Sequence, residues 1–150
     1  MKKSGWKVWH LPEAEIYHMT NKAYHAIEGP LDRLRALLKD DDNVLFAFLF
    51  GSHAEGTARK ESDIDIAVYF RLLPHGAGKL AAIDALSETA GRDVHLAALN
   101  EASALLRHQV LKYGVPVIIK DREAYFHFRE KTMANYDEYK FVSGMAVYDR

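Results

Sequence analysis

Two small polar groups in the middle of the chain have the residue types and spacing for phosphate and metal chemistry. Gly51 and Ser52 end one apolar run, and two aspartates one residue apart, Asp63 and Asp65, open the next. Residues two apart in a strand point to the same face, so both carboxylates would project from one end of a sheet. Such a pair repels unless a divalent cation lies between the carboxylates, and Mg²⁺ completes its shell with water and substrate phosphates. We therefore expect a site for a nucleoside triphosphate with magnesium.

The segment from the Gly-Ser pair to the aspartates would hold the phosphates. A glycine lets the backbone approach a ligand closely, and a serine at a helix start adds a hydroxyl beside free N–H groups. The intervening "HAEGTARKES" predicts a short helical turn and a loop, where Arg59 and Lys60 could offset triphosphate charge. Each residue also has an ordinary interpretation: Ser52 and Asp63 as caps of a helix or turn, and the two cations as solvated loop residues.

Four apolar runs of strand length would position these residues. The run at 44–50 is wholly apolar and predicts a strand covered on both faces, whereas 63–70 begins with alternation, so its leading end should reach the surface. A third strand is expected at 93–99. The run at 115–119 contains a proline and predicts an edge strand.

Helical patterns separate the strands. Leucines share one face of a helix at 31–40, namely Leu31, Leu34, Leu37 and Leu38. Further helices are expected at 79–90, at 101–113 with Asn100 as its cap, and from 122 to about 140. An earlier short helix would end at Gly29-Pro30.

This order predicts an α/β (α+β) fold, a small mixed β-sheet flanked by helices. We expect a helical extension over 1–29, the domain itself over 30–120, and a helix and apolar tail over 121–150 that pack on the domain or on a partner. The "GAGKLA" segment at 76–81 fits a dinucleotide pattern but follows a loop, so it predicts a helix entry.

Composition narrows the class of protein. A chain of 150 residues, 49% apolar, can bury one ordinary core. Its net charge of −1 argues against bulk attraction to nucleic acid or to a membrane surface. There are no cysteines, which excludes thiol catalysis and thiolate metal sites. No signal sequence or membrane span is evident, so we expect a cytoplasmic protein.

The spacing of Gly51-Ser52, ten residues and then Asp63-x-Asp65 resembles the signature of the DNA polymerase β-type nucleotidyltransferase superfamily. The stretch "LFGSHAEGTARKESDIDIAV" is especially similar to the minimal nucleotidyltransferase (MNT) proteins. A less specific likeness continues through "RDVHLAALNEASALLRHQVLKYGVPVI", so that the resemblance covers roughly residues 31–119.

This resemblance implies a two-metal transfer of a nucleoside monophosphate onto a hydroxyl, with loss of pyrophosphate. By position, Gly51 and Ser52 would hold the triphosphate of ATP, and Asp63 and Asp65 would bind Mg²⁺. Many MNT proteins are antitoxins that silence HEPN-domain ribonuclease toxins by adenylylating a toxin tyrosine, which makes a cognate HEPN toxin the expected partner. A homo-oligomer is compatible with the sequence, and direct nucleic-acid binding is not expected.

The chain departs from the family pattern in the third strand. The family usually has a third carboxylate there, but the apolar-flanked position in "VHL" is His95. Asp93 lies two residues earlier, displaced by about 6 to 7 Å along a strand, and is a poor substitute. A histidine can act as a general base but does not bridge two hard cations. We expect nucleotide binding to persist, with transfer slow or rebuilt around His95, unless His95 is simply a packed residue.

Two other functions remain open from the sequence. His95 favours an antitoxin or nucleotide-binding module that neutralises its partner by complex formation alone. A nucleotidyltransferase acting on a small hydroxylated substrate, such as an aminoglycoside, would normally have a second domain to hold that substrate.

The last helix raises two questions of its own. The "REAYFH" segment at 122–127 has the Arg-x4-His spacing of HEPN ribonucleases, which we interpret as chance. This helix has more aromatic residues than one buried face can hold, so some of them would pack on residues 1–29 or face a partner. They are Tyr125, Phe126, Phe128, Tyr136 and Tyr139.

Overall fold

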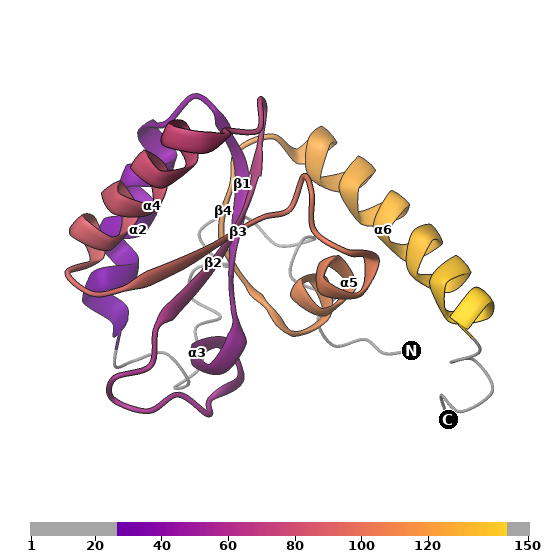
Figure 1. Ribbon diagram of the computed structural model, residues 1–150, viewed down its shortest axis with the longest axis horizontal. Helices are drawn as coiled ribbons and strands as arrows, with labels where there is room; N and C mark the ends of the chain where they lie inside the picture. The colour runs from indigo at the N-terminus through magenta and orange to yellow at the C-terminus, as the bar shows by residue number, and fades with distance from the viewer. Residues whose placement is uncertain (1–26, 144–150) are drawn as a thin grey trace.

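The computed structural model describes residues 27–143, and their side chains as far as Glu138. Within that range the chain forms a four-stranded sheet between two layers of helices (Figure 1). The helix expected before residue 27, the tail after 143 and the side chain of Tyr139 lie outside the described residues. No helix in the described range is both long and apolar enough to span a membrane.

The sheet is mixed, as predicted. Its strands are β1 (Val44–Phe50), β2 (Ile64–Phe70), β3 (Val94–Ala98) and β4 (Val115–Ile119), in the order β3-β2-β1-β4. β1 runs antiparallel to β2 and to β4, and β2 runs parallel to β3. The expected edge position of the last strand is confirmed, with Pro116 opposite Phe48 where the register with β1 shifts.

Helices cover both faces of the sheet (Figure 1). On one face lie α2 (Glu28–Asp40) and α4 (Gly76–Ala90), and on the other α5 (Ala104–Tyr113) and α6 (Arg122–Ser143). The short α3 (Gly51–Glu55) follows β1 directly at one end of the sheet. The predicted site residues Gly51, Ser52 and Asp65 lie at this end of the sheet.

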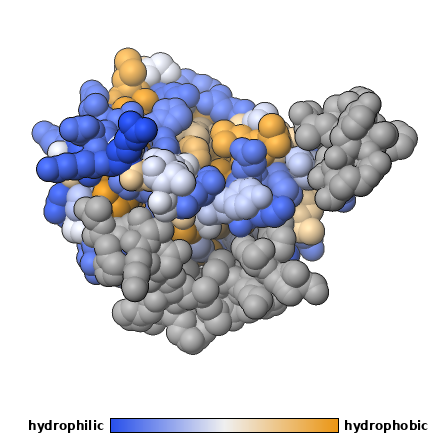
Figure 2. Space-filling view, turned by 90° about the horizontal axis from the view of Figure 1, so that it is seen from below, coloured by the Kyte–Doolittle hydropathy of each residue, from blue (hydrophilic) through white to orange (hydrophobic). Residues whose placement is uncertain are grey.

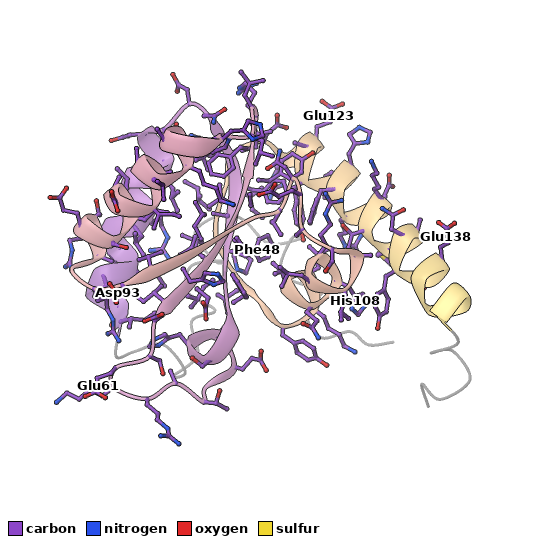
Figure 3. All side chains as sticks on the ribbon, viewed as in Figure 1. Phe48, Glu61, Asp93, His108, Glu123 and Glu138 are labelled. Carbon is purple, nitrogen blue, oxygen red and sulfur yellow. The ribbon has the colours of Figure 1, made fainter. Side chains whose placement is uncertain are left out.

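The core consists of two clusters, one on each face of the sheet, because β1 sends alternate side chains to opposite sides. Ala47 and Leu49 join Leu34 and its neighbours on the α2/α4 side. Phe46 and Phe48 join an aromatic cluster with residues of α5 and α6. Figure 3 shows Phe48 between the sheet and these helices. The prediction of a strand buried on both faces is confirmed.

Two expected helix boundaries were wrong. Gly29 and Pro30 do not end a helix but lie in the first turn of α2, which begins at Glu28. A proline is tolerated there because the first N–H groups of a helix have no intrahelical partner. The "GAGKLA" segment forms the first turns of α4, which begins at Gly76 and not at Lys79. It is the helix entry that the sequence predicted.

The expected cap of α5 was also wrong. Ser103, not Asn100, precedes the helix, and its hydroxyl accepts a hydrogen bond from the Leu106 N–H. Asn100 instead bonds the backbone of Phe70, accepting from its N–H at 2.9 Å and donating to its carbonyl at 2.8 Å. Because an amide side chain offers both a donor and an acceptor, Asn100 continues the strand pairing past the end of β3.

Candidate active site

Phe50, Asp65 and His95 form a row across three neighbouring strands. Asp65 is paired with Phe50 on β1 and with His95 on β3. His95 Nδ1 lies 3.1 Å from Asp65 Oδ1, and the rings of Phe50 and His95 approach with centroids 6.4 Å apart. The Asp65 side chain is 22% exposed and that of His95 is 64% exposed. The parallel register of β2 and β3 therefore brings together an acid and a base that lie 30 residues apart in sequence.

The row lies on the α5/α6 face of the sheet. The residues that follow Asp65 at two-residue intervals, Ala67 and Tyr69, belong to the aromatic cluster on that face, as does Phe50. Ile64 and Ile66 belong to the opposite cluster. Since alternate residues of a strand share a face, Asp65 points to the side of α5.

The glycine at position 51 leaves room for the Asp65 carboxylate. A Cβ built on Gly51 would overlap Asp65 Oδ2, and the glycine has a φ of +73°, which other residues rarely adopt. The sequence predicts that this glycine lets the backbone approach a ligand. In the structure it lets the backbone approach a carboxylate of the chain itself, and the cross-strand pairing that causes this is not visible in sequence.

Ser52 lies half-buried in the first turn of α3. Its carbonyl accepts a hydrogen bond from the Thr57 N–H at 3.0 Å and from the helix cap Gly56, which ends the turn with a φ of +78°. The residue before the helix is Phe50, and no side chain caps the first N–H groups of α3. Gly51, the first residue of α3, lies against Asp65, so this helix begins next to that carboxylate.

Asp63 occupies a different environment from Asp65. It is exposed, lies one residue before β2, and lines an open polar groove together with Lys60, Arg92 and Asp93. The neighbouring Ile64 N–H donates to the Asp93 carbonyl at 3.1 Å. Because Ile64 pairs with Val94, Asp93 lies beside Asp63, whereas His95 lies beside Asp65. The two-residue offset that made Asp93 a poor third carboxylate is therefore retained.

Arg59 and Lys60 lie on the exposed loop between α3 and β2. Their backbones are fixed: the Arg59 N–H donates to Ser62 Oγ at 2.8 Å, and the Lys60 carbonyl accepts from Arg92. Figure 3 shows Glu61 on the same loop, pointing away from the sheet. Among the described residues that are visible from below in Figure 2, hydrophilic residues predominate, with smaller apolar groups between them. Exposed loop cations suit either a solvated surface or contact with an incoming triphosphate.

The carboxylates fit a metal ion that arrives with its nucleotide. Among the described residues, no three histidine, aspartate or glutamate side chains gather closely enough to hold a metal ion. Magnesium needs only one or two protein carboxylates when phosphates and water supply its other ligands. Asp63 and Asp65 supply that number of carboxylates, whereas a structural metal centre would need more ligands from the protein.

Sequence reasoning missed two residues that contact this loop. His53 on α3 is 2% exposed, and its Nε2 lies 3.2 Å from the Ser62 carbonyl. Arg92, in the turn before β3, donates through Nη2 to the carbonyls of Ser62 at 2.7 Å and Lys60 at 2.9 Å. Both contacts end on backbone carbonyls, which have no residue-type signature, so the sequence carries no signal for them.

Comparison with known families gives this geometry a context. The family model described as "Polymerase beta, Nucleotidyltransferase" matches residues 32–123, more than half of the chain. The chain belongs to the polymerase beta nucleotidyltransferase family. The resemblance read from Gly51-Ser52 and Asp63-x-Asp65 is confirmed at this level.

Among curated proteins, the chain is similar to the protein adenylyltransferase MntA of Shewanella oneidensis strain MR-1. The two are 32% identical over 84 residues, which is 55% of this chain and 60% of the relative. The chain thus matches less than two thirds of that relative's length. What MntA does is therefore a basis for a proposal about this chain.

Solved structures share the fold. A chain of a toxin–antitoxin crystal structure with AMP-PNP is 27% identical with a TM-score of 0.68, over 79% of this chain and 96% of that one. A complex of a tri-AMPylated Shewanella oneidensis HEPN toxin with an MNT antitoxin matches at 24% identity and a TM-score of 0.64, over 80% and 94%. The second match, at its lower identity, shows the fold alone. The predicted polymerase β-type fold is confirmed.

Proposed function

We propose that this protein is an MNT-type antitoxin that transfers AMP from Mg-ATP to a tyrosine hydroxyl of a cognate HEPN-domain toxin. The observation that carries the proposal is the row at one end of the sheet, where Asp65 lies against Gly51 on one side and His95 on the other. Support comes from the similarity to a protein adenylyltransferase and to a toxin–antitoxin structure that contains AMP-PNP.

Each predicted site residue has a role in this proposal. Gly51 and Ser52 hold the triphosphate through the backbone N–H groups of α3, and Asp63 and Asp65 bind magnesium. Arg59 and Lys60 offset triphosphate charge from the loop. Magnesium, when bound, supplies charge neutralisation and alignment of the in-line displacement.

His95 takes the place of the third carboxylate. His95 Nδ1 lies 3.1 Å from Asp65 Oδ1; in the tautomer in which Nδ1–H donates to an ionised Asp65, Nε2 has a lone pair that can accept a proton. The His95 side chain is 64% exposed, and Nε2 is suited to accept the proton of the attacking tyrosine hydroxyl. An imidazole adds no negative charge, so we expect slower transfer than with a carboxylate at this position.

The test is transfer of label from ATP, with magnesium, to a candidate HEPN toxin, which is sought in the neighbouring reading frame as a small helical protein with Arg-x4-His spacing. We expect Asp63→Asn and Asp65→Asn to lower labelling on the order of 100-fold or more, because they remove ligands of an ion that contributes several kcal/mol. Asp42→Asn is the matched control, an exposed aspartate at the opposite end of β1.

The same assay tests His95. We expect His95→Ala to lower the rate of transfer and His95→Asp to raise it. Unchanged rates in both His95 variants would remove His95 from the mechanism.

A second function is favoured by the histidine at the third position, because an imidazole adds no negative charge and does not bridge two hard cations. In that case the chain neutralises the toxin by forming a complex, with or without bound nucleotide. Toxin neutralisation without label on the toxin, unaffected by Asp63→Asn and Asp65→Asn, would establish this function and exclude transfer.

A further inference from the structure

The loop that contains Asp63 has few hydrogen bonds between its own residues. Residues 56–63 join α3 to β2, and most of their side chains are exposed. Within the loop, Arg59 and Ser62 form one tight turn, with the Ser62 N–H donating to the Arg59 carbonyl at 3.0 Å and Ser62 Oγ accepting from the Arg59 N–H. Because exposed backbone is easily displaced, contacts from outside the loop must determine where Asp63 lies.

These outside contacts converge on the residue just before Asp63. The Ser62 carbonyl accepts one hydrogen bond from His53 Nε2 and another from Arg92 Nη2, at 3.2 and 2.7 Å. The first donor belongs to α3 and is buried, and the second belongs to the turn between α4 and β3. Figure 1 shows that turn at the same end of the molecule as the loop. The two lone pairs of one carbonyl are thus used by two separate elements.

The residue just after Asp63 is also fixed, since the Ile64 N–H donates to the Asp93 carbonyl and so begins the pairing of β2 with β3. Arg92 adds a bond to the Lys60 carbonyl at 2.9 Å. Asp63 is therefore held by backbone bonds on both sides, and its own carboxylate remains exposed at the groove that Arg92 lines.

We infer that Arg92 and His53 are positioning residues: by holding the Ser62 carbonyl, they place the Asp63 carboxylate for the magnesium-bound nucleotide. This inference rests on the proposed function. Residues that orient a metal-binding group commonly change metal affinity by about tenfold or more when mutated. Asp65 is held within β2, so loss of Arg92 should affect Asp63 selectively.

A matched control separates this role from general stability. Arg33 on α2 also donates to two backbone carbonyls, those of Thr89 and Ala90 at 2.9 and 3.0 Å, but it contacts the last turn of α4 and not the loop. We expect Arg33→Ala to lower thermal stability without changing nucleotide affinity. Arg92→Ala should weaken binding of Mg²⁺ with AMP-PNP by about tenfold, measured by calorimetry on the full chain. His53→Gln, which keeps a side-chain N–H donor, should retain more affinity than His53→Ala.

A double-mutant cycle then decides whether Arg92 acts through Asp63. If it does, Arg92→Ala should change the affinity less than about twofold in an Asp63→Asn background. An equal loss in both backgrounds, no loss from Arg92→Ala, or no loss from Asp63→Asn would overturn the inference. Asp65→Asn tests the proposed function separately: if that variant binds the nucleotide as tightly as the parent, the metal site itself is wrongly assigned.

Discussion

At the residue scale, the Asp65 carboxylate has two neighbours of different chemistry, Gly51 and His95. Gly51 leaves space for Oδ2, and His95 contacts Oδ1, so each carboxylate oxygen has its own surroundings. A residue with a side chain at position 51 would displace the carboxylate, and it would also have to adopt a positive φ.

We predict that Gly51→Ala lowers the free energy of unfolding by about 1–2 kcal/mol from the left-handed backbone alone. It should also weaken binding of Mg²⁺ with AMP-PNP at least about tenfold, because the added methyl group displaces Asp65 Oδ2. Urea unfolding and calorimetry measure the two effects. Gly76→Ala is the control: its φ is +51°, but a Cβ there meets nothing within 4 Å, so it should lose stability and keep nucleotide affinity. Equal affinities in the two variants would contradict this explanation.

At the scale of elements, the segment between β3 and α5 contains two residues that could cap the helix, Asn100 and Ser103, and only Ser103 does so. Asn100 bonds both backbone groups of Phe70 at the end of β2, and the helix start falls to Ser103 three residues later. An asparagine satisfies either role, so the choice depends on the position of β2, which is remote in sequence.

We predict that Ser103→Ala lowers stability by about 1 kcal/mol, the usual effect of losing a helix N-cap, and that Ser103→Asp restores it because a carboxylate also accepts from N–H groups. The change in urea midpoint at constant slope measures this effect. Nucleotide affinity should stay at the parent value. Full stability in Ser103→Ala would show that the Leu106 N–H finds another partner.

At the scale of the whole molecule, the sheet separates two apolar cores, and Tyr125 brings an ionisable group into one of them. Its side chain is 2% exposed and packs against Phe46 and Phe48. Burial raises the pKa of Tyr125 to about 12, an effect that the nearby positive charge of Arg129 partly offsets. The neutral phenol is therefore favoured in the folded protein.

Because the pKa of Tyr125 is higher in the folded protein than in the unfolded chain, we predict that the protein loses stability at alkaline pH. The unfolded chain releases the Tyr125 proton near its ordinary pKa of 10.0, while the folded protein keeps it up to about 12. Stability from this group is thus complete below about pH 10 and falls by roughly 2–3 kcal/mol as the pH rises to 12.

In urea unfolding at several pH values, Tyr125→Phe should lose less stability than the parent over this range. Tyr113→Phe, at a position 52% exposed, should retain the parental loss. Parallel curves for Tyr125→Phe and the parent would refute the assignment.

The sequence by itself determined the strands, most of the helices and the chemical residues. Apolar runs of strand length locate β1 to β4 within a residue, because strands buried on both faces need continuous apolar side chains. The spacing of Gly51-Ser52 and Asp63-x-Asp65 indicated the family, since residue types that bind phosphate and metal stand out at strand ends.

Only the tertiary structure decided which groups meet. The order β3-β2-β1-β4 and the register of β2 with β3 bring His95 to Asp65 and Asp93 to the side of Asp63. The tertiary structure also showed that Arg92 and His53 converge on the Ser62 carbonyl. These contacts depend on strand pairing and on backbone acceptors. A backbone carbonyl is the same in every residue, so no pattern of side chains could reveal them.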